Sequence, residues 1–166
     1  MATLKKDFFY ISIVAVLVIV GFAGTGHAQD TALKAINPAS LPPAHGYSHV
    51  VVAPPGQFVS ISGQVAMDST GTVVGVGNFE AQCEQVFKNL RRALHSVGLT
   101  FKDVVRTDMY VTSLDYLSEL RECRARYLPA EDPPTATLVK VDALFNPDLM
   151  LEIAVEAVFP AKKIAQ

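Results

Sequence analysis

The stretch NLRRALHSVGLTFKDVVRTDMYVTSLDYLSELRECRARYL, residues 89–128, decides the fold. Its first part ends an amphipathic helix, because Gly98 followed by Leu99 is the stop expected of a Schellman-type cap. Residues 104–112 then alternate between two faces, as a strand does. Ser113 is placed to cap a second helix that fills the rest of the stretch. A helix, a strand and a second helix in this order predict a domain of mixed α and β structure.

The first helix begins upstream of this stretch. Asn78 is a good N-cap, and Glu80 suits the positive end of the helix dipole. The second helix is expected from Leu114 to about Leu128, and the segment from Pro129 to Pro134 ends it. Each helix carries one apolar stripe at helical spacing. The stripes are Phe79, Cys83, Val86, Leu90, Ala93, Leu94 and Val97 on the first helix, and Leu117, Leu120, Tyr127 and Leu128 on the second.

Strands are expected on both sides of the two helices. Val50 to Val52 and Phe58 to Val65 are separated by a Pro-Pro-Gly turn signal and are expected to form a hairpin, with Gly63 at a bulge or a close backbone approach. Residues 135–141 and 150–159 supply the last two strands. The β-β-α-β-α-β-β order predicts an α+β domain with two helices on one face of a sheet. Because several strands are apolar on both sides, we expect self-association to cover the other face.

Composition and charge exclude several classes of protein. The chain has 166 residues, 14 Lys and Arg, 16 Asp and Glu and a net charge of −2. That balance argues against a nucleic-acid partner held by a basic field. Two cysteines are too few for a small scaffold built on disulfides. The sequence contains no nucleotide, hydrolase or zinc motif, and His45 and His49 beside prolines do not make a metal site, so no metal or cofactor is expected.

The N-terminus has the three-part plan of a secretory signal. Lys5 and Lys6 precede an apolar run over residues 8–23, and small residues follow it up to Ala28. We expect cleavage after Ala28 and export to the periplasm or the medium, with no membrane partner afterwards. The alternative is retention as an N-terminal membrane anchor. The predicted division of the chain is a signal peptide (1–28), an irregular N-terminal arm (29–45), one domain (46–160) and a C-terminal tail (161–166).

Cys83 and Cys123 fall on the two predicted helices. Each can be a small buried core residue, which is the usual place of a free cysteine. Alternatively they form a disulfide, because adjacent antiparallel helices bring the early part of one near the late part of the other, and export brings them into an oxidising compartment. A nucleophilic cysteine is disfavoured, since no histidine on a nearby element would generate the thiolate.

Glu152 and Glu156 interrupt the last strand, which is otherwise apolar. A carboxylate among apolar residues costs free energy unless it is paired, solvated or used. Two interpretations stay open from the pattern alone. Either this face of the strand touches solvent at both points, or a carboxylate acts as a general acid–base or holds a water molecule in a cleft.

Residues 89–128 resemble the signature core of the RidA/YjgF family, which is also labelled the L-PSP endoribonuclease family. Further matches are Tyr47, the segment SGQV at 62–65 and the segment LEIA at 151–154. The resemblance covers the chain from Tyr47 to Phe159. It implies a chorismate-mutase-like α+β fold and a homotrimer whose sheets pack in a barrel-like core. It also implies that a small-molecule ligand binds in clefts between subunits.

The best-known activity of this family is hydrolysis of small enamine and imine acids, such as 2-aminoacrylate, to 2-keto acids and ammonia. In the family an arginine holds the substrate carboxylate through a two-pronged salt bridge, which a guanidinium suits. A glutamate, matched here by Glu152, holds the attacking water. The resemblance also implies that Tyr47, Ser62 and Gly63 line the pocket.

The chain departs from the family pattern at the arginine. Active deaminases carry Ala-Arg-Ser followed by Cys or Thr where this chain has Thr-Ala-Thr-Leu at 135–138. Ala136 therefore stands where the arginine should be, and Leu138 replaces the pocket Cys or Thr. Arg121 stands on the second helix where deaminases usually have Asn, and it is a candidate substitute for the missing guanidinium.

Two functions of different classes follow. The first is a RidA-like hydrolase of imine and enamine metabolites, with Glu152 as the catalytic residue and Arg121 as a new anchor. The second is a non-catalytic trimer that binds a small ligand, because Ala136 cannot bind a carboxylate. No residue supports a third class, a partner-binding or chaperone-like trimer. The low net charge gives no electrostatic support to the endoribonuclease label.

Overall fold

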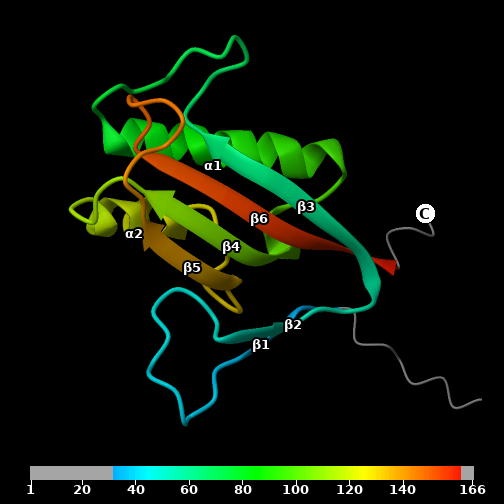
Figure 1. The fold of residues 1–166 in the computed structure, drawn as a ribbon. Coiled ribbons are helices and arrows are strands. Elements are labelled where there is room, and N and C mark those ends of the chain that lie inside the picture. The colour runs from blue at the N-terminus through cyan, green and yellow to red at the C-terminus, as the bar shows by residue number, and fades with distance from the viewer. Residues whose placement is uncertain (1–31, 162–166) are drawn as a thin grey trace, which may run out of the picture.

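A computed structural model describes residues 32–161 of the chain. The predicted signal peptide (1–28) lies outside the described residues, as does the predicted tail beyond Ala161, so both stay predictions. The described elements are shown in Figure 1. In chain order they are β1 (Lys34–Ile36), β2 (Val50–Val52), β3 (Gly56–Val65), α1 (Phe79–Ser96), the short 3₁₀ helix η1 (Phe101–Asp103), β4 (Val104–Val111), α2 (Leu117–Ala125), β5 (Thr135–Lys140) and β6 (Leu151–Pro160).

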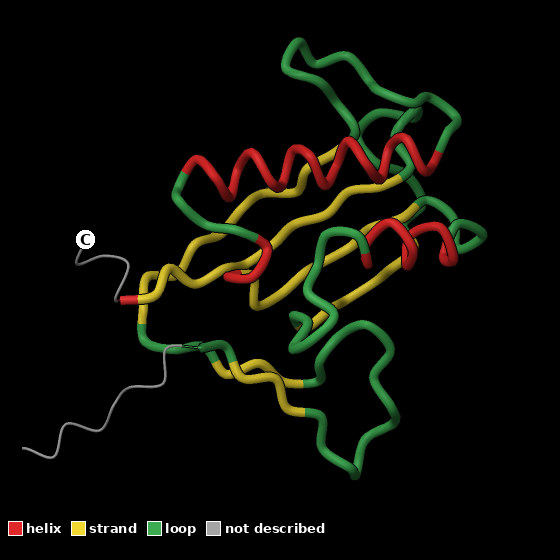
Figure 2. The backbone as a smooth tube through the Cα atoms, turned by 180° about the vertical axis from the view of Figure 1, so that it is seen from behind, coloured by secondary structure: helices red, strands yellow, loops and turns green. Residues whose placement is uncertain are grey.

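Four strands form the main sheet in the order β3-β6-β4-β5. β6 is antiparallel to both of its neighbours, β3 and β4, whereas β4 and β5 run parallel. Both helices lie on one face of this sheet, behind it in Figure 1 and in front of it in Figure 2. The predicted α+β architecture with two helices on one face is therefore confirmed.

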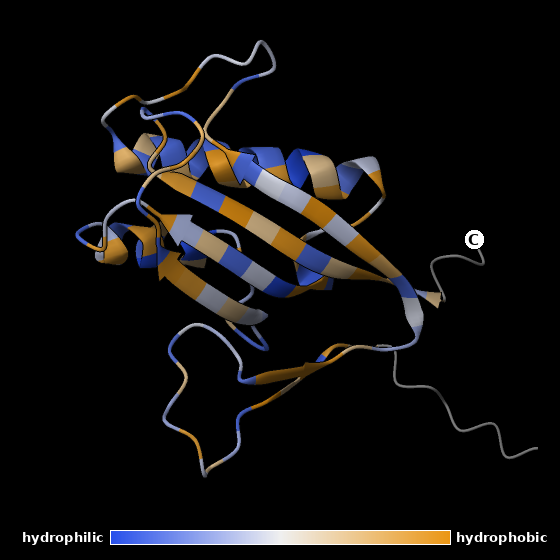
Figure 3. Cartoon of the chain, viewed as in Figure 1, coloured by the Kyte–Doolittle hydropathy of each residue, from blue (hydrophilic) through white to orange (hydrophobic). Residues whose placement is uncertain are grey.

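The core lies between the helices and the two central strands, β4 and β6. Buried and partly exposed residues alternate along β6 from Leu151 to Ala157. Figure 3 shows polar bands between apolar ones on this strand. Such alternation places every second residue on the helix-covered face. Those residues of β6 are at most 2% exposed; they are Leu151, Ile153, Val155 and Ala157.

α1 begins and ends where the sequence predicts. The Asn78 side chain accepts a hydrogen bond from the backbone N–H of Ala81 at 3.0 Å. Gly98 has φ +74° and donates to the carbonyl of His95, while Leu99 donates to the carbonyl of Leu94. This pair of bonds is a Schellman motif, so the predicted cap is confirmed.

α2 is shorter than predicted. It covers Leu117–Ala125, whereas the sequence suggested a helix from 114 to 128. Ser113 does not cap it; its hydroxyl accepts from the backbone N–H of Asp115 and closes a turn before the helix. Serine and aspartate favour such local turns because their side chains compete with the helix for backbone groups. Tyr116 takes the N-cap position and makes no side-chain cap hydrogen bond.

The predicted hairpin between residues 50–52 and 58–65 is wrong. β2 pairs instead with β1 in a separate two-stranded sheet, with Ile36 opposite Val50. The stretch Pro54-Pro55 favours extended backbone and leads the chain from β2 into β3 without a tight reversal. β1 lies within the stretch predicted to be an irregular arm, and its three residues are too few to produce a period in the sequence.

Gly63 fulfils both roles that the sequence left open. The register of β3 against β6 shifts between Ile61 and Gln64, so Gly63 lies in a β-bulge. A Cβ at this position would overlap the carboxylate of Glu152. Glycine therefore leaves room for the Glu152 side chain of the neighbouring strand, which would have to move aside for any larger residue.

Cys83 and Cys123 form a disulfide that joins α1 to α2. Their Cα atoms are 6.5 Å apart, and neither residue is exposed to solvent. Of the two alternatives for these cysteines, free core residues or a disulfide, the structure contains the disulfide.

The face of the sheet away from the helices stays open in the single chain. Phe58 on this face is 64% exposed, and Val139 is 41% exposed. Arg106 and Asp108 form a salt bridge of 3.0 Å on the same face. Covering of this face by other copies of the chain stays a prediction. Within residues 32–161, none of the helices has the length and apolar character needed to cross a membrane.

Candidate functional site

One cavity brings together four of the predicted site residues. It has a volume of about 400 Å³ and lies between α2, β5 and the loop before β2. Tyr47 comes from that loop, Arg121 from α2, and Ala136 and Leu138 from β5. The loop is fixed next to β5 because the N–H of Ser48 donates to the carbonyl of Pro134 at 3.1 Å. The cavity is completed by Met109, Leu117, Leu120, Arg124 and His45.

The cavity has one apolar part and one cationic part. Ala136 and Leu138 meet apolar side chains of β4 and α2 and form the apolar part. Arg121 and Arg124 supply the cationic part, and no aspartate or glutamate lines the cavity. Ligand pockets are commonly apolar with a few placed polar groups that fix orientation. This cavity therefore suits a ligand with an anionic head and an apolar body.

Arg124 is a site residue that the sequence analysis did not identify. It is half-buried, and its Nη2 donates to the carbonyl oxygen of His45 at 3.3 Å. Burial and the nearby positive charge of Arg121 lower the pKa of Arg124. Within residues 32–161 neither arginine forms an ion pair. Two adjacent guanidinium groups without a carboxylate partner favour the binding of an anion.

The spacing of Arg124 from Arg121 in the sequence could have identified it as a second site residue. Arg121 and Arg124 are three residues apart on a helix, which makes them neighbours on its surface. Two basic residues at this spacing repel each other when nothing lies between them. The spacing alone does not show that both face a cavity, because that depends on how α2 lies against β5 and the loop before β2.

A second cavity, of about 420 Å³, shares His45, Arg121 and Arg124 with the first. Its other lining residues come from the loop before β2, the end of α2 and the loop that follows α2. They are Gly46, Ala125, Leu128, Pro129 and Ala130. The two arginines therefore line both cavities, and the second of these is the more apolar.

The remaining predicted residues lie on the opposite face of the sheet. Tyr110 on β4 is the register partner of Glu152 on β6, whereas its neighbour Met109 is the partner of Leu138 on β5. Because successive residues of a strand point to opposite faces, Glu152 and Leu138 project from opposite sides of the sheet. Gly63 lies directly against the Glu152 carboxylate. One chain therefore does not bring Glu152 to the cavity of the arginines.

Glu152 and the bulge beside it form a separate group. Glu152 is half-buried, and within residues 32–161 it forms no ion pair. Ser62 is exposed, and the Gln64 side chain donates to the carbonyls of Ser62 and Gly63 at 3.1 and 3.4 Å. This group offers a carboxylate and exposed backbone on the open face of the sheet.

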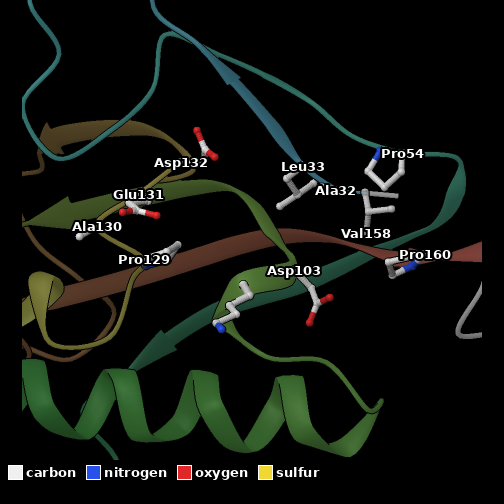
Figure 4. Close-up of a pocket in the computed structure, with 11 residues that line it drawn as sticks. Ala32, Leu33, Pro54, Asp103, Pro129, Ala130, Glu131, Asp132, Val158 and Pro160 are labelled. Carbon is white, nitrogen blue, oxygen red and sulfur yellow. The ribbon is translucent and has the colours of Figure 1, made fainter. Parts of the chain in front are cut away.

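A third cavity lies elsewhere, and none of the predicted site residues lines it. It has a volume of about 600 Å³ and separates the N-terminal strands from η1 and the end of β6. Figure 4 shows Leu33, Glu131, Asp132 and Asp103 around it. Its lining holds three acidic side chains and one basic side chain, Lys102, so its net charge is negative and disfavours the carboxylate expected at the arginines. Within residues 32–161 no group of three His, Cys, Asp or Glu side chains is arranged to hold a metal ion.

Comparison with known proteins agrees with this fold. The sequence profile of the family described as "Endoribonuclease L-PSP" matches residues 38–159. A RutC family protein from Synechocystis is 30% identical over 129 residues, which are 77% of this chain and 98% of that protein.

Two solved structures extend the comparison. A Rid family protein of unknown function from Yersinia pestis has a TM-score of 0.72 and 34% identity, and the match covers 76% of this chain and 98% of that one. RidA from an Antarctic Psychrobacter species has a TM-score of 0.58 and 29% identity, with 79% of this chain and all of that one covered. The relatives and the chain thus share one complete domain.

Proposed function

We propose that this chain, which belongs to the endoribonuclease L-PSP (RidA/YjgF) family, hydrolyses small imine and enamine acids and releases ammonia. The observation that carries the proposal is the pair Arg121 and Arg124 on the wall of a cavity that Tyr47, Ala136 and Leu138 also line. Ala136 stands at the position of the family's arginine, and the pair supplies guanidinium groups to the same cavity. The carboxylate of the substrate would lie against the arginines, and its apolar part would fill the space beside Leu138.

Arg121 and Arg124 are suited to hold a carboxylate. Each guanidinium presents several N–H donors in a rigid fork, which matches the two oxygens of a carboxylate. Bringing an anion between two like charges also relieves their mutual repulsion. Anion binding therefore favours both arginines in the positions that the structure gives them.

The proposed site is completed by a second copy of the chain. Glu152 lies on the open face of the sheet, away from the arginines of its own chain. In a homotrimer, the Glu152 and Gly63 group of one copy would face the arginine cavity of its neighbour. The exposed apolar side chains of this face, Phe58 and Val139, support its burial against another copy.

The proposed reaction is the hydrolysis of a protonated imine. A water oxygen bonds to C2 while Glu152 accepts a proton from that water. The nitrogen of the resulting carbinolamine then takes up this proton from Glu152, and the C–N bond breaks. The hydroxyl group loses its proton to solvent water and becomes the keto group. The products are a 2-keto acid and ammonia. An enamine enters the same sequence after it takes up a proton at C3.

Decay of enzymatically generated imines tests the proposal. The substrates are 2-aminoacrylate and 2-imino-4-methylpentanoate, and the catalysed decay should exceed the uncatalysed decay for both. Replacing Arg121 and Arg124 together by alanine should lower kcat/KM by about 100-fold, because two charge-assisted contacts are lost. Arg92→Ala, which removes an exposed arginine of α1, is the matched control and should leave the rate unchanged. Decay that never exceeds the uncatalysed rate would rule the hydrolase out.

The second candidate function is binding without turnover. It is favoured by Ala136, which removes the family's arginine from β5, and by the distance in the fold between Glu152 and the arginines of the same chain. Glu152→Gln separates the two functions. Under the hydrolase proposal this change abolishes turnover and spares binding, whereas a pure binding protein returns its ligand unchanged with either side chain.

Export of the chain is part of the proposal. The Cys83–Cys123 disulfide supports it, because disulfides persist mainly in oxidising compartments. We expect the protein from the periplasm or the medium to begin at Gln29. Sequencing of its N-terminus tests this, and a chain that keeps residues 1–28 in the membrane fraction would support the anchor instead.

A further inference from the structure

The two arginines of the cavity lie on a helix that is weakly fixed by its own sequence. α2 has nine residues, and isolated helices of this length are unstable in water. Its N-cap residue, Tyr116, makes no side-chain cap hydrogen bond. Only Leu120 and Cys123 are buried within the helix. The position of α2 must therefore come from its attachment to the rest of the domain.

Cys123 is the strongest of these attachments. It lies two residues after Arg121 and one residue before Arg124, so the covalent bond to Cys83 of α1 is made between the two cations. Ring stacking and ion pairs add contacts with α1 on both sides of α2, such as Tyr116 against Phe79 before the helix. At the C-terminal end, Arg126 pairs with Glu84 at 2.7 Å. This pair is partly exposed, and exposed ion pairs are weak.

Placing Arg124 at the cavity is opposed by two physical effects. Its guanidinium is half-buried, and Arg121 brings a second positive charge next to it. Its one hydrogen bond within residues 32–161, to the carbonyl of His45, is 3.3 Å long. Arg121 is already exposed, so a helix without a restraint can rotate or fray and move the Arg124 guanidinium into water, which removes its burial cost and screens the repulsion.

We infer that the Cys83–Cys123 disulfide is a positioning element for the anion site, so that carboxylate binding by Arg121 and Arg124 requires the oxidised chain. The inference rests on the proposed function for the identity of the ligand. Reduction breaks the Sγ–Sγ bond, and two electrons and two protons from a dithiol convert it to two thiols. A thiol-reducing environment would then switch the site off while the sheet and α1 stay folded.

The experiment compares the oxidised chain with the Cys83→Ala/Cys123→Ala variant. The probe is 2-oxobutanoate, a 2-keto acid of the proposed product class, and its amide serves as a neutral analogue. Calorimetric titration should show binding of the acid weakened by about tenfold or more in the variant, whereas the weak binding of the amide should change little. A difference between acid and amide reports on the arginines and not on general stability.

Leu94→Ala is the matched control for stability. Leu94 is fully buried on α1 and lines neither arginine cavity, so its loss destabilises the fold without releasing α2. Both variants are titrated well below their Tm. If the Leu94→Ala variant loses as much affinity for the acid as the cysteine variant, or if the cysteine variant binds normally, the inference is overturned.

Hydrogen exchange gives a second measurement that needs no ligand. Amide exchange over residues 117–125 should accelerate in the cysteine variant and after reduction by dithiothreitol, while exchange over residues 151–157 stays slow. Unchanged exchange in α2 overturns the inference whatever the function is. If α2 loosens but the oxidised chain binds 2-oxobutanoate no better than the Arg121→Ala/Arg124→Ala variant does, the proposed function has failed and the positioning of α2 stands.

Discussion

α1 and α2 are fixed in the fold by different means. α1 has eighteen residues, a side-chain cap at Asn78, a Schellman motif at Gly98 and eight buried residues. α2 has nine residues, no side-chain cap and two buried residues, one of which is a disulfide cysteine. The candidate anion site lies on the second of these helices. A site on a helix that is held mainly by contacts with other elements can be weakened without unfolding the domain, so variants of α1 and α2 should affect stability and ligand binding differently.

Removal of the disulfide should have the largest effect. The bond closes a loop with a sequence separation of 40, for which the chain-entropy relation gives a stabilisation of about 4 kcal/mol. We expect the Cys83→Ala/Cys123→Ala variant to lose about this much free energy of unfolding in urea denaturation. Fast exchange should be confined to α2 in the native state. Equal loosening of α1 would contradict the contrast between the two helices.

Truncation of Leu94 in the apolar stripe of α1 should have the second largest effect on stability. Leu94 is fully buried, and replacing a buried leucine by alanine costs about 3 kcal/mol. Because Leu94 is part of the core and not of the site, the loss should appear in the Tm and leave ligand affinity intact below it. A fall in affinity that matches the fall in stability would show that the two helices are not independent.

Removal of the α1 N-cap should have a smaller effect. Asn78→Ala deletes the side-chain acceptor for the N–H of Ala81 and should cost about 1 kcal/mol. Asn78→Asp keeps an acceptor and should restore most of the loss. If the Asn78→Ala variant has the same Tm as the wild type, the N-cap contributes nothing to the stability of α1, and the contrast with α2 is correspondingly weaker.

The smallest effect concerns the contact between the end of α2 and α1 at low pH. Hydrogen bonds from Tyr127 and Arg126 lower the pKa of Glu84 below its usual value. A carboxyl whose folded pKa is depressed stabilises the fold above its unfolded pKa, near 4.5, and loses that contribution as the pH falls through the folded pKa. Because Glu84 is partly exposed, the contribution should stay below about 1 kcal/mol.

Glu84→Gln is the test of this contribution. The variant should be less stable than the wild type at pH 7. The difference between their Tm values should disappear as the pH falls from 4.5 through the lowered pKa of Glu84 in the folded chain. A difference that persists at low pH would mean that Glu84 acts through packing and not through its charge.

The same contrast explains how much of the fold the sequence predicts. α1, β4 and β6 each carry a full period and their own capping or turn residues, so their positions follow from local patterns. β1 has three residues, which are too few to form a period, so its position does not follow from the chain near it. The apolar stripe predicts α2, but without a side-chain cap the ends of this helix do not follow from the sequence. The pairing of β2 with β1 is a tertiary preference that overrides the turn signal at Pro54.

The residues of the candidate site also fall into two groups, those that the sequence identifies and those that only the packing of the chain reveals. The resemblance identified Tyr47, Arg121, Ala136 and Leu138, and these residues line one cavity. It did not identify Arg124, because only the packing of α2 against β5 brings that residue to the cavity. The two faces of the sheet separate Glu152 from this cavity. That separation follows from strand register, which a motif match does not contain.

The central claim is that Arg121 and Arg124 hold the carboxylate of a small acid, and a crystal structure with 2-oxobutanoate tests it most directly. We predict that the carboxylate lies within hydrogen-bonding distance of at least one of the two guanidinium groups, with the alkyl end near Leu138. Binding in the acidic cavity beside Leu33, or a carboxylate that contacts neither arginine, would contradict the account.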